Sequence, residues 1–359
     1  MGFVSLVPFV AQHRRERAVP GLITKRTTST KGSKGCFLFV TRTTDLNRRF
    51  AYALRRGMAW WLLPGGVLLL ILIGLAYWQL VVAEGAYLGR RVVVALYDLY
   101  ASRYDRIKQF QPVAEDYFLG RPLALALSHR PIPWVLDVAT GTGRLPLTLL
   151  RQPPFTGQVI ALDLSRRMLR QAARRRRELA DTLPGCARRW TLLWQDAQQL
   201  PFPDGVFDAV TCLEALEFLP DPPAALAEMV RVLQPGGLLL VTNRIGSGVR
   251  WLPGRTYTPE QFAGMLTDLG LTAVETHLWQ VDYNLVWARK PPGAARQRGQ
   301  TRRPAHPLDL LCCPACGIGP MRRDEQALHC TDCRRRYPIA ADGVVELTRS
   351  SRRFPPAIA

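Results

Sequence analysis

Apolar and polar positions from about residue 90 to residue 290 predict strands that alternate with helices. The short apolar runs that we expect to form strands are 134–137, 159–163, 190–194, 207–213, 238–242, 272–278 and 283–288. Helical stretches lie between them, beginning at Leu145 and covering 166–180 and 224–233. This alternation predicts a parallel sheet with right-handed crossovers. Few residues separate the last two strands, so we expect that pair to be antiparallel.

A second pattern is the complete absence of charge between Arg56 and Glu84. A run of ~20 apolar residues is long enough to cross a bilayer as a helix. Aromatic residues of the kind found at bilayer interfaces stand near both ends of the run, at Trp60, Trp61, Tyr77 and Trp78. The pattern predicts one transmembrane helix over 58–84. A buried core helix is the alternative, but few soluble helices stay uncharged over this length.

The rest of the chain divides by composition. Residues 1–57 are basic and show no sustained period, so we expect a disordered extension, which a translation start at Met58 would remove. The main predicted domain covers 85–290. It is followed by a linker over 291–306, a small cysteine-containing module over 307–350 and a tail over 351–359.

The net charge of +20 lies mostly at the two ends of the chain. Basic and acidic residues number 12 and 2 in residues 1–57, 24 and 20 in 58–290, and 12 and 6 in 291–359. The central domain is therefore almost balanced. Nucleic-acid binding through the ends stays open, but the charge distribution does not favour it.

A glycine-rich loop follows the first predicted strand and reads Asp137-Val138-Ala139-Thr140-Gly141-Thr142-Gly143. Its glycines allow a sharp turn and a close approach to a ligand. Asp163 ends the next strand, where a carboxylate can accept both ribose hydroxyls. Pro146 replaces the third small residue of a dinucleotide-binding loop. Asp137 would repel a pyrophosphate but favours the ammonium and sulfonium groups of S-adenosylmethionine.

Three segments carry a resemblance to a known family, namely 135–143, 200–210 (Leu-Pro-Phe-Pro-Asp-Gly-Val-Phe-Asp-Ala-Val) and 233–237 (Leu-Gln-Pro-Gly-Gly). Through them the chain resembles class I S-adenosylmethionine-dependent methyltransferases of the ubiquinone and menaquinone biosynthesis type (methyltransferase type 11). The resemblance implies an α/β fold with a Rossmann-like seven-stranded sheet, helices on both faces and a reversed last strand.

The resemblance also implies how the cofactor is held. Asp196 and Ala197 would flank the adenine with Met168 packed nearby, Leu213 and Glu214 would lie beside the methionine moiety, and the segment with Tyr97 and Tyr104 would close over the cofactor. The full set expected to bind S-adenosylmethionine is Asp137, Ala139, Thr140, Gly141, Gly143, Asp163, Leu164, Met168, Asp196, Ala197, Leu213, Glu214, Tyr97 and Tyr104. As alternatives, Asp163 only caps the following helix, and the two tyrosines only pack in the core.

No catalytic residue follows from the sequence. Methyl transfer from a sulfonium mainly requires alignment and desolvation of the acceptor, and a base is needed only if the acceptor loses a proton. Related enzymes often carry a His near the position of Glu217, and this sequence has no such His. Glu217 is a weak candidate, and a solvated acid at a helix start is the simpler interpretation. A run of arginines around 166–177 is taken as a solvated face, with lipid headgroups as a second interpretation.

Two CxxC pairs near the C-terminus predict a structural zinc site. The expected ligands are Cys313, Cys316, Cys330 and Cys333. The adjacent residues Cys312 and His329 could replace one of them as a ligand. Together with Leu311 and 337–345, these cysteines resemble the small zinc-ribbon proteins that activate tRNA and protein methyltransferases. The resemblance implies that such a ribbon covers hydrophobic surface on the enzyme, or binds a protein partner.

The sequence as a whole predicts a single-pass membrane methyltransferase with a zinc ribbon. The catalytic domain is expected to face the cytoplasm, where S-adenosylmethionine is found, and Arg90 and Arg91 after the span agree with this. The acceptor is expected to be small or lipid-like. Methylation of RNA or of a translation protein is one alternative, and a non-catalytic cofactor-binding adaptor is another.

Overall fold

The computed structural model describes residues 64–293, 304 and 306–348. The predicted extension over 1–57 and the tail over 351–359 lie outside the described residues, as does most of the linker. The chain divides into two compact units, residues 1–74 and residues 75–359, which are described separately.

The uncharged stretch forms a helix over Pro64–Val82, whose last turn, Trp78–Val82 (η1), is a π-helix. It has a mean hydropathy of 2.2, and none of its 18-residue window is buried, so by length and composition it is able to cross a membrane. Side chains such as Leu70, which is 69% exposed, have no protein core around them. Within the described residues the helix is not buried, unlike most core helices of soluble proteins.

Unit 75–359 is built on a sheet whose seven central strands have the order β3-β2-β1-β4-β5-β7-β6. Their bounds are β1 Trp134–Val138, β2 Gln158–Asp163, β3 Trp190–Trp194, β4 Phe207–Cys212, β5 Leu233–Arg244, β6 Thr272–Gln280 and β7 Tyr283–Arg289. The first five are parallel, and β7 is antiparallel to both neighbours, as the short connection predicts. β5 starts earlier than expected because Leu233 pairs with Phe207 before a register irregularity.

An eighth strand corrects the expected count of seven. β11, Val344–Glu346, comes from the cysteine-containing segment and pairs in parallel with β3, with Val344 opposite Leu192 and Glu346 opposite Trp194. Without β11 the edge of β3 would leave a row of backbone N–H and C=O groups unpaired. A strand of three residues so far along the chain carries no periodicity that would predict this pairing.

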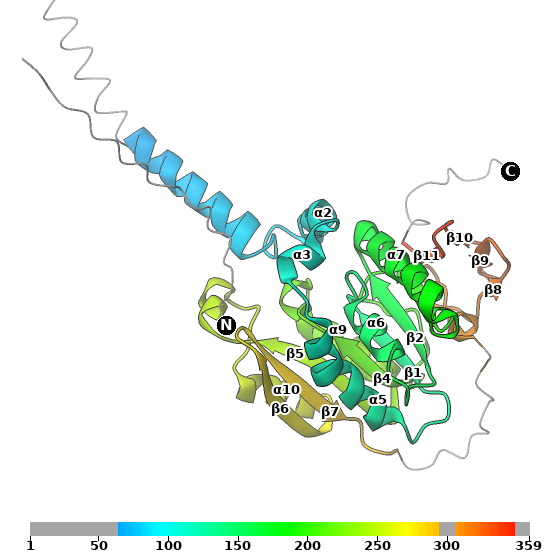
Figure 1. Ribbon diagram of the computed structural model, residues 1–359. Coiled ribbons are helices and arrows are strands. Elements are labelled where there is room, and N and C mark those ends of the chain that lie inside the picture. The colour runs from blue at the N-terminus through cyan, green and yellow to red at the C-terminus, as the bar shows by residue number, and fades with distance from the viewer. Residues whose placement is uncertain (1–63, 294–303, 305, 349–359) are drawn as a thin grey trace, which may run out of the picture. The chain divides into compact units, whose positions relative to one another are not determined.

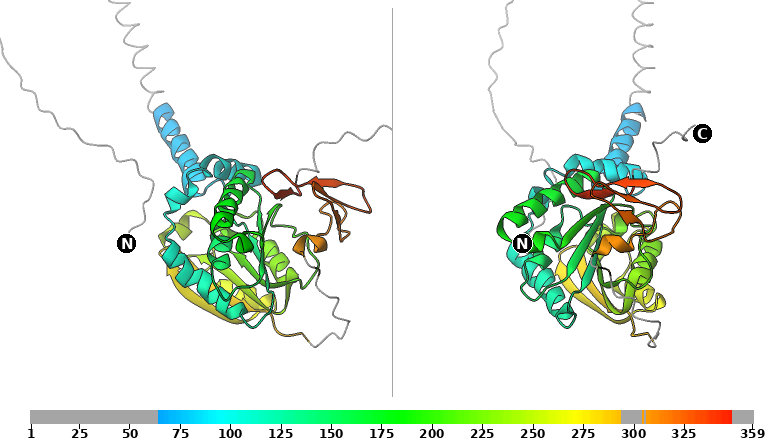
Figure 2. Two further views of the ribbon diagram at one scale, coloured as in Figure 1. Left: turned by 45° about the vertical axis from the view of Figure 1, so that its right-hand side comes forward. Right: turned by 90° about the vertical axis from the view of Figure 1, so that its right-hand side faces the viewer.

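Helices cover both faces of the sheet (Figures 1 and 2). One face packs against α5 (Arg121–Leu127), α6 (Arg144–Leu150) and α7 (Arg166–Thr182), through residues such as Leu123, Leu149 and Leu169. The other packs against α9 (Pro222–Val232) and α10 (Pro259–Asp268), through Leu226 and Phe262. The remaining helices are α2 Arg90–Tyr100, α3 Tyr104–Lys108, α4 Pro112–Glu115, η2 Asp116–Gly120, α8 Pro184–Ala187, η3 Leu216–Phe218, η4 Ser247–Trp251 and η5 Pro307–Leu310.

The cysteine-containing segment shares a hydrophobic core with the large sheet. It forms its own small sheet of β8 (Arg322–Arg323), β9 (Ala327–His329) and β10 (Arg336–Pro338). Leu311, Tyr337 and Val345 are fully or almost fully buried in the cluster that contains the strands β1, β2 and β4. The segment therefore packs on the domain instead of standing apart from it.

Two arginines of α7 attach β11 to the domain. Arg166 donates to both carboxylate oxygens of Asp342 at 2.9 Å and to Glu346 at 3.0 Å. Arg176 donates to the Asp342 carbonyl at 2.9 Å and to the Trp190 carbonyl at 3.1 Å. The interpretation of the arginine run as a solvated face is therefore wrong for these two residues, which bind the C-terminal segment.

We expect Arg166→Ala to loosen β11 and to lower the free energy of unfolding by about 1–3 kcal/mol, since it removes the guanidinium that binds both Asp342 and Glu346. Hydrogen exchange of the amides of Val344, Val345 and Glu346 would measure the loosening. Arg170→Ala, at an exposed position of the same helix, is the control and should leave that exchange unchanged. Equal exchange in the two variants would contradict the attachment.

Candidate functional site

The residues predicted to bind the cofactor gather at one edge of the sheet. Asp137 lies in β1 and Asp163 ends β2, while Asp196 follows β3 and Glu214 follows β4. The four strands are parallel neighbours, so their carboxyl ends meet at this edge. The order reverses between β1 and β4, and such a switch point is where open α/β sheets bind ligands.

The glycine-rich loop is tied to the end of β2. The N–H of Gly141 donates to Asp163 Oδ2 at 2.7 Å, and the N–H of Thr140 donates to the carbonyl of Leu162 at 2.9 Å. A Cβ atom at Gly143 (φ 82°) would lie 2.3 Å from Trp190 Cζ2, whereas one at Gly141 (φ 56°) would meet nothing within 4 Å. Gly143 is thus required by packing, and Gly141 borders open space in which a ligand fits.

The carboxyl groups of Asp137, which is buried, and Asp163, which is partly buried, lie at this edge. Burial raises the pKa of Asp137 to about 7, although hydrogen bonds from Thr140 and Thr211 oppose the rise. Burial likewise raises the pKa of Asp163 to about 6, against backbone hydrogen bonds from Ser165 and Gly141. Within the described residues, neither group forms an ion pair. A ligand with positive charge and hydroxyl groups, such as S-adenosylmethionine, fits this donor set.

Helices α2 and α3 close over the loops. Asp98 accepts from the Ser165 hydroxyl at 2.5 Å, and Asp105 accepts from the Thr142 hydroxyl at 2.6 Å. The rings of Tyr97 and Tyr104, from the same two helices, lie 6.1 Å apart, and burial raises the pKa of both hydroxyls. The two interpretations of these tyrosines are compatible, because the rings pack together while their helices cover the loops.

An ion network that the sequence analysis missed lies beside Glu214. Arg144 donates to Glu115 at 2.5 and 2.7 Å and to Glu214 at 2.6 Å, and Lys108 donates to Glu214 at 3.2 Å. The guanidinium lies 4.2 Å from the ring of Phe110. Burial raises the pKa of Glu214, but Lys108 and Arg144 outweigh it and lower that pKa. The position of Arg144 directly after the glycine-rich loop is the one sequence signal for this network.

Glu217 lies in η3 and is only 2% exposed, so its interpretation as a solvated acid is wrong. Its Oε1 atom accepts from the Tyr283 hydroxyl at 2.5 Å and from Arg244 at 3.3 Å. Burial raises the pKa of Glu217, although Arg244 and Tyr283 oppose the rise. Glu84 accepts from the Tyr97 hydroxyl at 2.8 Å and acts electrostatically on the same group of residues. These five residues are called the Glu217 cluster below.

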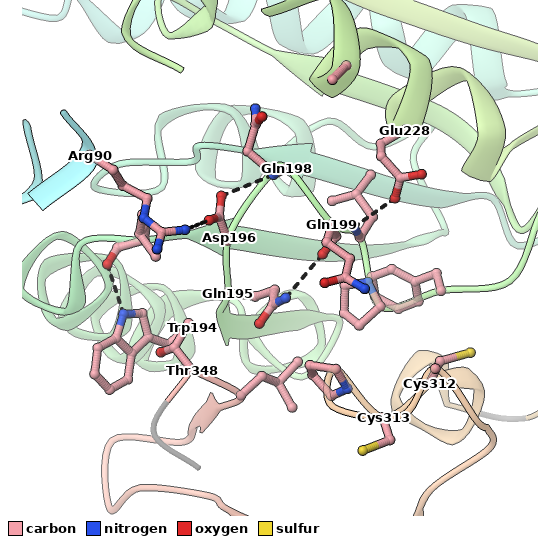
Figure 3. A pocket seen from close by; sticks show the side chains of 18 of the residues that line it. Arg90, Trp194, Gln195, Asp196, Gln198, Gln199, Glu228, Cys312, Cys313 and Thr348 are labelled. Atoms are coloured by element: carbon pink, nitrogen blue, oxygen red, sulfur yellow. Dashed lines mark hydrogen bonds and ion pairs between the residues drawn. The ribbon is translucent and has the colours of Figure 1, made fainter. Parts of the chain in front are cut away.

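A groove of about 1790 Å³ runs between the loop after β3, helix α9 and the C-terminal segment (Figure 3). At one side lies Asp196, which forms an ion pair with Arg90 and accepts from the N–H of Gln198 at 3.0 Å. At another lie Cys312 and Cys313. The predicted adenine end of the site therefore opens into a space that the cysteine-containing segment helps to form. The ion pair with Arg90 was not predicted.

The four predicted zinc ligands come together. Their sulfur atoms all lie within 4.8 Å of one another, with 3.5 Å between Cys313 and Cys333 and 3.6 Å between Cys316 and Cys330. Tetrahedral zinc with Zn–S bonds of ~2.3 Å places its sulfur ligands ~3.8 Å apart, which these distances match. Cys312 and His329 are not part of the cluster. The ring of His329 is hydrogen-bonded to the carboxylate of Asp324 at 2.7 Å.

Comparison with known families places two matches on the chain. Residues 136–241 match the family described as a methyltransferase domain, and residues 308–340 match the family of Trm112p-like proteins. The chain therefore contains an S-adenosylmethionine-dependent methyltransferase domain followed by a Trm112p-like segment.

Similar curated proteins are named for quinone methylation. Demethylmenaquinone methyltransferase of Streptomyces avermitilis is 29% identical over 209 residues, which is 57% of this chain and 84% of that protein. The same-named protein of Thermus thermophilus is 40% identical over 39% of this chain and 60% of its own. The 2-phytyl-1,4-naphtoquinone methyltransferase of Synechococcus elongatus is 35% identical over 40% and 60%. The chain thus spans only part of the length of these relatives.

Among solved structures, a SAM-dependent methyltransferase from Aquifex aeolicus matches with a TM-score of 0.39 and 21% identity, over 50% of this chain and 99% of its own. A chain from the complex of the Haloferax volcanii Trm112 methyltransferase activator with a methyltransferase matches with a TM-score of 0.41 and 20% identity, over 54% of this chain and 97% of its own.

The two loop glycines provide a matched pair of variants. Gly143→Ala should lower the free energy of unfolding by roughly 3 kcal/mol, because its Cβ meets Trp190 and the backbone is left-handed. Gly141→Ala should cost only about 1–2 kcal/mol, yet should weaken S-adenosylmethionine binding, because its Cβ enters the open space. Thermal denaturation and calorimetric titration would measure the two effects. Equal loss of stability would contradict the packing role of Gly143.

Proposed function

We propose that this protein methylates a small or lipid-like acceptor with a hydroxylated ring, such as a quinone precursor, at a membrane surface. The similarity to enzymes named for demethylmenaquinone methylation carries the proposal. The apolar helix Pro64–Val82 supports a single-pass tether. The catalytic domain would face the cytoplasm, where its cofactor is available.

The residues at the carboxyl edge would hold S-adenosylmethionine, which supplies a methyl group already attached to a good leaving group. Asp163 would accept hydrogen bonds from the ribose hydroxyls, and Asp137 would face the positive charge. The adenine would lie on the side of Asp196 that faces the groove, after the side chain of Arg90 has moved away from Asp196. The other proposed contacts are Ala139, Thr140, Gly141, Gly143, Leu164, Met168, Ala197, Leu213, Glu214, Tyr97 and Tyr104.

The Glu217 cluster would hold the hydroxyl of the acceptor. Tyr283 and Arg244 bind Oε1 of Glu217, and Oε2 would be the atom that accepts a proton. Oε2 would accept the hydroxyl proton of the acceptor, which makes the adjacent ring carbon nucleophilic toward a methyl group. Once methylated, that ring carbon would lose its own hydrogen as a proton and the ring oxygen would regain one, so that the ring becomes aromatic again. A pKa raised by burial makes Glu217 a better proton acceptor than an exposed carboxylate.

Cys313, Cys316, Cys330 and Cys333 would bind one structural zinc ion. Through β11 and its contacts with α7, the segment would stabilise the edge of β3 within one chain, as a permanently attached activator. The Trm112p-like match also favours a second function, methylation of RNA or of a translation protein. Docking of a separate protein partner on this segment is a further proposal.

The acceptor class is tested by incubating the full chain with S-adenosylmethionine labelled on the methyl group and with separated lipid, RNA and protein fractions. We expect label in the lipid fraction. Glu217→Gln should lower kcat by at least ~10²-fold, and Glu260→Gln, at an exposed position on α10, should not. Label only in RNA or protein would overturn the lipid acceptor. Cofactor binding with no label in any fraction would favour the non-catalytic adaptor.

Cofactor affinity should depend on pH through Asp137. Its pKa of about 7 in the folded protein is above that of an ordinary Asp, so the carboxyl is largely neutral below pH 7 and ionised above it. Binding of a cation should therefore tighten as the pH rises to about 7, by up to ~10-fold per unit, and then level off. Isothermal titration between pH 5.5 and 8.5 would show this. The Asp137→Asn variant should bind S-adenosylmethionine weakly, with an affinity that changes less with pH. An affinity that does not change with pH in the parent chain would contradict the role of Asp137 in binding the cation.

The same shift has a consequence for stability without the cofactor. Because the folded pKa of Asp137 lies above its unfolded value, the contribution of Asp137 to stability is present below pH ~4 and is lost as the pH rises to about 7. Ionised Asp137 is therefore costly to the empty protein, which makes a bound cation more stabilising.

A further inference from the structure

Three separate segments meet at one surface of unit 75–359, and this surface carries the inference. Trp78, in the last turn of the apolar helix, donates its indole N–H to the Trp251 carbonyl at 3.0 Å. Tyr87 donates its hydroxyl to the Pro253 carbonyl at 2.8 Å. The N–H of Ile245 donates to the Asp282 carbonyl at 2.8 Å. Residues 77–88, 245–255 and 281–282 are called the three-segment surface.

The three-segment surface combines exposed apolar side chains with arginines. Leu88 and Trp251 are each 49% exposed, and Val281 is 61% exposed. The guanidinium of Arg250 lies 5.5 Å from the ring of Trp251, and that of Arg255 lies 5.5 Å from the ring of Tyr87. Tryptophan and tyrosine beside arginine are typical of the interface between bilayer and water, where anionic headgroups attract the guanidinium.

Negative charge is almost absent from this surface. Segment 245–255 contains no acidic residue, and Glu84, the one acid of segment 77–88, directs its carboxylate to the Tyr97 hydroxyl. Asp282 is only partly exposed. Arg250 is exposed, whereas Arg255 is partly exposed and also donates to the carbonyls of Leu219 and Ala86. An acidic protein surface would pair with Arg250 but would also meet exposed Leu, Val and Trp side chains. An anionic bilayer satisfies both kinds of side chain.

Each of the three segments also supplies the Glu217 cluster. Glu84 lies within the first segment, Arg244 immediately precedes the second, and Tyr283 immediately follows the third. The surface and the buried polar cluster are therefore parts of the same three stretches of backbone.

We infer that the three-segment surface lies against the membrane interface and that the acceptor passes from the bilayer directly to the Glu217 cluster. The occupant is a bilayer with anionic headgroups, because the apolar helix ends within this surface at Val82. The inference rests on the membrane tether of the proposed function. It adds to it a second, interfacial contact by the folded domain itself.

Photo-cross-linking of the full chain in nanodiscs of phosphatidylcholine and phosphatidylglycerol tests the inference. The photoreactive residue p-benzoylphenylalanine is placed singly at Val281, at Leu72 and at Ile132. Ile132 is 57% exposed and precedes β1, at the opposite end of the strands from the site, so it is the matched control. We expect lipid adducts at Leu72 and Val281, and a severalfold lower yield of adducts at Ile132.

The possible outcomes distinguish the interfacial contact of the folded domain from the membrane tether of the proposed function. Adducts at Leu72 without adducts at Val281 would overturn the interfacial contact but leave the tether intact. Equal adducts at Val281 and Ile132 would also overturn it, since lipid would then reach any exposed site. Absence of adducts at Leu72 would overturn the tether itself. None of these readouts depends on methyl transfer, so failure of the enzymatic assay is a separate result.

Discussion

The parallel pairing of β1 with β2 on one side and β4 on the other is the constraint on which the site depends. It brings Asp137, Asp163 and Glu214 to one edge, although they are distant along the chain. It also leaves the backbone at the switch point free to turn away in two directions. The loop after β1 then fits against β2 through Gly141 and Asp163, and against β3 through the contact of Gly143 with Trp190.

Charge divides this edge into two parts. Glu115 and Glu214 are already neutralised by Arg144 and Lys108, so that part is electrostatically complete without a ligand. Asp137, which is buried, and Asp163, which is partly buried, form no ion pair within the described residues, and burial raises the pKa of each. A cationic cofactor would stabilise only the second part. The division explains why the pKa of Glu214 is lowered while the pKa values of Asp137 and Asp163, at the same edge, are raised.

The sequence predicted the features that depend on local pattern. All seven central strands, the glycine-rich loop and the four-cysteine cluster follow from short runs of residues whose spacing dictates the local structure. The features that it missed depend on partners far away in the chain. β11 is too short to have a period, and Arg166 looks like any exposed arginine until Asp342 is placed beside it. Glu217 was taken as solvated because nothing nearby in sequence reveals the burial by Tyr283.

The start of α7 connects the helices above the cofactor loop to the C-terminal segment. Ser165, its N-cap, donates to Asp98 of α2, and the next residue, Arg166, binds Asp342 and Glu346. One turn of helix is therefore held from both sides. A shift of α2 that frees Asp196 from Arg90 has to move against Ser165, and so against the residue that fixes β11. Because the two attachments share one helix end, looseness in either would weaken the positioning of the other. The C-terminal segment is thereby coupled to the geometry at Asp163, two residues before Ser165.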